Sequence, residues 1–168
     1  MTKQNSYLKI KNYFENIVHQ SNFLNEFIGF FEREWTTKKA SFAGIKSPVL
    51  ALFRYELGFD SPNENALAVR KVAFAIMLKT EKPDDFSAQY SAIDVAEKLA
   101  LKVLSRINFD SNTQDHFLWN SFLKDSVVIN PVELSANDFG VEVFFNLKNK
   151  QLLKVNIEDW QDIDSVCQ

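Results

Sequence analysis

The chain has 168 residues, of which 46% are hydrophobic and 24% charged, and this balance predicts one folded domain over residues 1–168. The net charge of −3 argues against a protein that binds nucleic acid by neutralising many phosphates. The single cysteine, Cys167, excludes an internal disulfide, and no apolar run is long enough to span a bilayer. Because the polar N-terminal residues do not resemble a signal peptide, we expect a protein that is cytoplasmic when made.

The first expected element is a helix over residues 6–35. Apolar residues recur at helical spacing from Tyr7 to Phe31, and Ser6 is suited to capping the N-terminus. The apolar stripe lapses at residues 19–22. Either one long helix continues through this polar patch, or two helices meet at Asn22.

A loop is expected over residues 36–47. It contains Lys38, Lys39 and Lys46, which make it basic, and Phe42, an apolar side chain in a polar setting. One interpretation is a solvated connection. The other is a binding arm with Phe42 as its anchor, because long loops often carry function.

Two strands are expected next, over residues 49–57 and 68–80, and they should pair as an antiparallel hairpin through a turn that holds Phe59. In the first strand, one face carries Val49, Ala51, Phe53, Tyr55 and Leu57. The second strand has a bulky face with Val72, Phe74, Ile76 and Leu78, and a small face with Val69, Ala73, Ala75 and Met77. Such an alternation is typical of a strand that is buried on both sides, so the bulky face should pack on helices. The small face leaves room for a second layer from this chain or from another copy.

The rest of the chain predicts a second helix at residues 87–108, an ambiguous segment at 109–124, and strands at 127–134, 141–147 and 152–157. Pro131 suits the first of these strands to an edge or a bulge. An acidic tail follows from residue 158 to 168, so the core should span about residues 6–157. The fold class is therefore α+β, with a mostly antiparallel sheet of about four strands and two main helices packed on one face.

No arrangement of residues predicts catalysis, a cofactor or a metal site. The four glycines are scattered singly, so no Gly-rich phosphate loop exists, and neither histidine has a partner at helical spacing. Asp115 and His116 beside Asp110 are the nearest approach to an acid–base cluster, but they are expected in a solvated turn. The acidic tail lacks the spacing of a calcium loop. We therefore expect a protein that is not an enzyme.

The order of elements resembles the tail-terminator, or tail-completion, proteins of long-tailed phages and prophages. The segments that carry the resemblance are residues 47–53, 70–78, the alanine-rich helix and residues 139–145. The resemblance implies a ring, commonly a hexamer, that ends the tail tube and joins it to the head. Its partners would be copies of itself and other tail or head–tail connector proteins, without membrane contact or direct reading of nucleic acid, and its final location would be the virion.

The surface expected to form the interface includes the basic loop, the hairpin turn and the small face of the central strand. Its residues are Lys38, Lys39, Phe42, Lys46, Phe59, Ala73, Ala75 and Met77. The acidic tail is expected to be solvated or to meet the basic loop of another subunit. The alternative function is an α+β interaction module that binds one protein partner through the strand edge near Pro131 or the aromatic segment 117–122.

Overall fold

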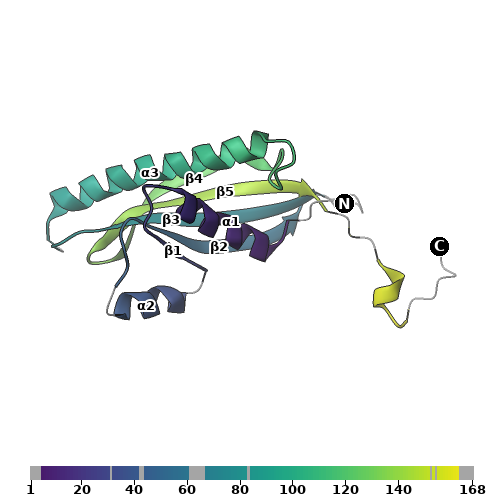
Figure 1. Cartoon of the computed structure of the whole chain (residues 1–168), viewed down its shortest axis with the longest axis horizontal. Helices are drawn as coiled ribbons and strands as arrows, with labels where there is room; N and C mark the ends of the chain where they lie inside the picture. Colours follow the sequence, from purple (N-terminus) through teal and green to yellow (C-terminus); the bar gives the residue numbers. More distant parts are fainter. Residues whose placement is uncertain are drawn as a thin grey trace.

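A five-stranded sheet in the order β1-β2-β3-β5-β4 forms the centre of the computed structural model (Figure 1). The structure describes residues 5–30, 32–41, 44–60, 67–82, 84–151, 153 and 155–162. The strands are β1 (Glu26–Ile28), β2 (Val49–Phe59), β3 (Leu67–Lys79), β4 (Phe122–Ser135) and β5 (Asp138–Lys150). The helices are α1 (Tyr7–Gln20), α2 (Glu32–Ala40) and α3 (Phe86–Asn112), followed by a short 3-10 turn, η1 (Ile157–Asp159). All pairs are antiparallel except β1 with β2.

Strand β3 is the central strand, as its two-sided alternation predicts. It pairs with β5 along its whole length and with β2 on its other edge. Val72, Phe74 and Ile76 point into the main core and are at most 1% exposed. The α+β class, the mostly antiparallel sheet and the antiparallel pairing of the first two predicted strands are thereby confirmed.

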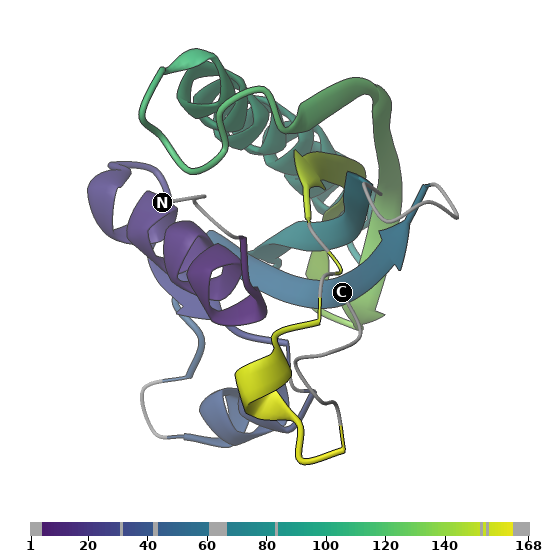
Figure 2. The ribbon, with the colours of Figure 1, turned by 90° about the vertical axis from the view of Figure 1, so that its right-hand side faces the viewer.

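Helices α1 and α3 cover one face of the sheet, and α2 lies on the other side (Figure 2). Helix α3 begins at Asp85, whose side chain accepts a hydrogen bond from the amide of Ala88. Its small residues Ala96 and Ala100 are fully buried, which brings the helix close to β3 and β5. Helix α1 packs Phe14 against the rings of Phe74 and Phe145, at 5.5 and 6.3 Å between ring centroids.

The expected helix over residues 6–35 is wrong beyond Gln20, and the polar stretch at 19–22 is where α1 ends. Asn25 donates its backbone N–H to Pro48 O at 2.9 Å and its side-chain amide to Ser47 O at 2.6 Å. These bonds begin the parallel pairing of β1 with β2. Phe27 faces the main core while Ile28 faces the opposite side. Tertiary pairing therefore overrides the helical spacing of the apolar residues.

Three other expectations need correction, and the ambiguous segment 109–124 is resolved. The expected loop 36–47 is helical as far as Ala40, within α2, and Phe42 lies outside the described residues. A bulge between Leu52 and Arg54 shifts the register of β2, so Tyr55 pairs with Val72 on the core side and does not share the face of Ala51. Segment 109–124 ends α3, makes turns, and starts β4 at Phe122. The expected strand 152–157 is absent at the described residues 153 and 155–157.

A buried carboxylate joins the two main helices. Asp110 of α3 is 4% exposed and accepts hydrogen bonds from the Tyr13 hydroxyl at 2.7 Å and from Arg106 Nε at 2.8 Å. Burial raises the pKa of Tyr13 far above its ordinary value of 10.0, and the hydrogen bond to Asp110 raises it further. The group that the sequence singles out as a possible acid–base residue thus has a structural role between helices.

Replacing Tyr13 by Phe should reduce the free energy of unfolding by about 1–2 kcal/mol, because Asp110 loses a buried donor. The folded-state pKa of Tyr13 lies above the unfolded value, so the contribution of Tyr13 to stability is present below pH 10.0 and is lost as the pH rises above it. Urea unfolding at pH 7 and above pH 10 measures both effects. Tyr7→Phe, at a side chain that is 40% exposed, is the matched control. Equal losses in the two variants would contradict this role for Asp110.

Candidate functional site

The second face of the sheet is only partly covered, and it holds an apolar groove beside α2. We call this the α2 groove. It has a volume of about 440 Å³, with Trp35 of α2 on one side, Val132 and Leu134 of β4 on the other, and Ala51 and Ala75 at its base. Among the described elements, α2 is the one helix that crosses this face, and the groove lies beside it.

Small residues in register make the base of the groove. Ala51 of β2 pairs directly with Ala75 of β3, and Ala75 pairs with Glu142 of β5. Side chains of this size on adjacent strands leave a hollow that larger residues would fill. Glu142 also lines the groove and supplies a carboxylate at its edge.

Two aromatic rings meet beside the groove, and one of them, Phe53, lines it. Phe53 sits at the bulge of β2, and its ring lies edge-to-face with that of Phe144 at 5.8 Å between centroids. Ala73, which pairs with Phe144, is small enough to allow this approach. The guanidinium of Arg54 lies 6.0 Å from the Phe144 ring, so the bulge places two successive side chains of β2 on this face.

Several apolar side chains on this face remain open to solvent. Phe53 is 41% exposed, Leu134 48% and Val128 51%. Phe53 and Leu134 line the groove together with Trp35, and Val128 pairs with Phe144 on the neighbouring strand. Exposed apolar surface of this kind, beside a concave hollow, is typical of an interaction site.

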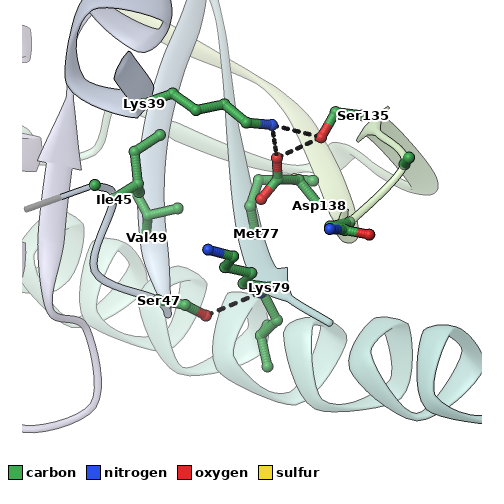
Figure 3. Close-up of a pocket in the computed structure, with 12 residues that line it drawn as sticks. Lys39, Ile45, Ser47, Val49, Met77, Lys79, Ser135 and Asp138 are labelled. Carbon is green, nitrogen blue, oxygen red and sulfur yellow. Dashed lines mark hydrogen bonds and ion pairs between the residues drawn. The ribbon is translucent and has the colours of Figure 1, made fainter. Parts of the chain in front are cut away.

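A second, more polar hollow of about 320 Å³ adjoins the end of α2 (Figure 3). Lys39 reaches across it, donating to Ser135 Oγ at 2.7 Å and pairing with Asp138 at 2.5 Å. Because Lys39 follows Trp35 by one helical turn and Ser135 follows Leu134, this bridge borders one end of the α2 groove. Lys79 also lines the second hollow, and its side chain forms no ion pair within the described part of the chain.

The structure brings four of the sequence-predicted interface residues together around α2. Lys38, Lys39, Ala75 and Met77 all lie on or beneath this helix. Lys38 donates to Phe27 O at 2.6 Å and pairs with Glu26 at 3.2 Å, so its charge, like that of Lys39, is engaged within the chain. Ala75 and Met77 are at most 2% exposed. They form the floor of the sheet face beneath α2.

The remaining predicted residues do not line the groove or lie outside the description. Ala73 is fully buried between Arg54 and Phe144 in neighbouring strands. Phe59 is 41% exposed at the far end of the sheet, opposite Ala68. The amide of Lys46 donates to Glu26 at 2.8 Å, and its side chain is exposed. Phe42 belongs to the residues that the structure does not describe.

Sequence reasoning missed the residues that border the groove. The sequence predicts Trp35 at the end of the helical stretch 6–35, and it predicts Phe53 on a face whose register the bulge changes. Leu134 closes the predicted edge strand, and nothing in its spacing marks it as part of a groove. The signal that remained in the sequence was the small face of β3, which predicts a space above it but not what surrounds that space.

Within the ranges described, no group of three or more His, Cys, Asp and Glu side chains is placed to hold a metal ion. The described helices include none that is long and apolar enough to cross a membrane. Comparison with protein-family models, curated proteins and solved structures found no match. The functional argument therefore depends on the surface itself.

Replacing Lys39 by Ala should loosen α2 without unfolding the sheet. The Lys39 side chain is 46% exposed, so the loss of global stability should be small, about 0–1 kcal/mol. Amide exchange in residues 32–40 should nevertheless become faster, because the bridge to Asp138 fastens the end of this helix. Lys98→Ala, which removes an exposed pair on α3, is the control. Unchanged exchange in α2 would contradict a fastening role for Lys39.

Proposed function

We propose that the protein is a structural assembly protein of a phage or prophage tail, which forms a ring that terminates the tail tube and joins it to the head. The observation that carries the proposal is the uncovered apolar face around the α2 groove. The resemblance of the sequence pattern to tail-terminator proteins is the reason for proposing this particular assembly.

The covering of the sheet supports self-association. In the part of the chain that the structure describes, α1 and α3 bury one face, whereas the short helix α2 alone crosses the other, where Phe53, Val128 and Leu134 are exposed. A sheet in a stable domain normally buries each apolar face against another layer. A neighbouring subunit would supply the missing layer here, and the aromatic residues at the groove suit the centre of an interface.

The shape of the surface favours a head-to-tail contact. The α2 groove is concave and lies toward the end of the sheet where β4 turns into β5, so a second copy of the groove does not fill it. A projecting part of the neighbour is needed instead. Contacts between two different surfaces close into a ring when the rotation between subunits permits.

A second candidate is an interaction module that binds one protein partner. The observation that favours it is the position of β4 at an edge of the described sheet, where an extended peptide is able to add as a further strand. Pro131 has no N–H to offer and interrupts that edge. The aromatic segment 117–122 is the other surface expected for this module. Within it, Leu118 is buried and Trp119 is 46% exposed.

Replacing Leu134 by Glu should dissociate the oligomer while leaving the fold intact, because the side chain borders the groove and is 48% exposed. The measurement is native mass by light scattering after size exclusion, over a concentration series, with circular dichroism to check folding. Tyr90→Glu on α3, where the side chain is 73% exposed, is the control and should leave the mass unchanged.

We expect a closed oligomer, near six subunits, for the unaltered chain and the control, and a monomer for Leu134→Glu. A monomer at every concentration for the unaltered chain would contradict self-association and favour the single-partner module. An oligomer that survives Leu134→Glu would place the interface elsewhere.

A further inference from the structure

The chain continues beyond the sheet as an arm with exposed apolar side chains. We call the described residues 151, 153 and 155–162 the C-terminal arm. It leaves the end of β5 and carries η1 away from the body of the molecule (Figure 1). Leu153, Val155 and Trp160 are 55%, 61% and 57% exposed. This concentration of exposed apolar groups on one short segment indicates a segment that binds a surface.

The start of the arm is held firmly. Arg70 is 3% exposed and donates hydrogen bonds to the Tyr55 hydroxyl, to Asn5 O and to the side chain of Asn149, one residue before the end of β5. Lys148 pairs with Asp60 at 2.5 Å beside it. The end of β5, from which the arm leaves, is therefore fixed within the sheet.

We propose that the C-terminal arm of one copy docks in the α2 groove of the next copy, with Trp160 seated between Trp35 and Leu134. This inference rests on the proposed self-association and names the segment that makes the contact. The indole ring matches a groove with an apolar base and aromatic or aliphatic sides. A buried indole N–H needs an acceptor, and Glu142 supplies a carboxylate at the edge of the groove.

The arm and the groove lie toward opposite ends of the sheet. Glu142, beside the groove, precedes Lys150, where the arm begins, by eight residues along β5, a distance of about 26 Å at the rise of a strand. Figure 1 shows α2 toward one end and η1 beyond the other. An arm that departs from one end and a groove near the other join successive copies head to tail, as a ring requires.

The charges near the two partners are compatible with this contact. Glu158 and Asp159 directly precede Trp160 in the arm. Lys79 lies in the hollow next to the groove, exposed and without an ion pair in the described ranges (Figure 3). The carboxylates of Glu158 and Asp159 would therefore lie near the ammonium group of Lys79 when Trp160 binds in the groove. Lys38 and Lys39 are less available, because each is already paired within its own chain.

A cross-linking experiment between two differently tagged full-length chains tests the proposal. Both carry Cys167→Ser, which removes the natural thiol. One also carries Gln161→Cys, beside the intact Trp160, and the other carries Leu134→Cys in the groove. Oxidation of the mixture should give a disulfide-linked pair with one copy of each tag. Tyr90→Cys in place of Leu134→Cys is the matched control and should give none above background.

A second comparison uses native mass. Trp160→Ala should raise the protein concentration at which the oligomer forms by at least tenfold. Trp119→Ala should leave that concentration unchanged, although this ring, just before β4, is 46% exposed. If the unaltered chain is an oligomer but neither the cross-link nor the Trp160→Ala shift appears, the arm assignment is overturned and the proposed assembly stands. If Gln161→Cys and Leu134→Cys react only when both are in one chain, the arm folds back on its own subunit and the proposal is overturned. If the unaltered chain is monomeric, both proposals fail.

Discussion

The two faces of β3 carry side chains of different size, and the rest of the structure depends on this difference. Val72, Phe74 and Ile76 fill one side, and Ala73, Ala75 and Met77 occupy the other. The large side chains on one face pack against α1 and α3. Small side chains on the opposite face allow Phe53 and Phe144 to meet over Ala73, and they leave a groove over Ala75 that α2 covers in part. The core and the candidate interface thus follow from one alternating stretch.

The main helices and the long strands could be predicted because their patterns are local. The small residues of α3, the alternation of β3 and β5, and the polar break after α1 are each visible within a few residues. Strand β1 could not be predicted, because its three residues continue a helical spacing and become a strand only when Asn25 binds the chain at Ser47 and Pro48. The bulge in β2 is likewise a property of its pairing with β3.

The candidate site was predictable in part. The small face of β3 indicated a surface with room for another layer, and the structure places a groove there. The lysines near residue 38 were a less useful signal, because charge alone does not show that Glu26 and Asp138 neutralise Lys38 and Lys39 within the chain. The residues that border the groove come from α2, β2 and β4, so only the tertiary fold brings them together. The exposure of Trp160 on the arm likewise depends on where β5 ends and in which direction the chain leaves.

Amide hydrogen exchange of the unaltered chain, compared at low and high protein concentration, tests most directly whether the second sheet face is buried by another copy. The account predicts slower exchange at high concentration in residues 32–40 and 128–134, which border the groove, and no change along the exposed side of α3. Exchange that is independent of concentration throughout, or protection that appears on α3 and not beside the groove, would contradict it.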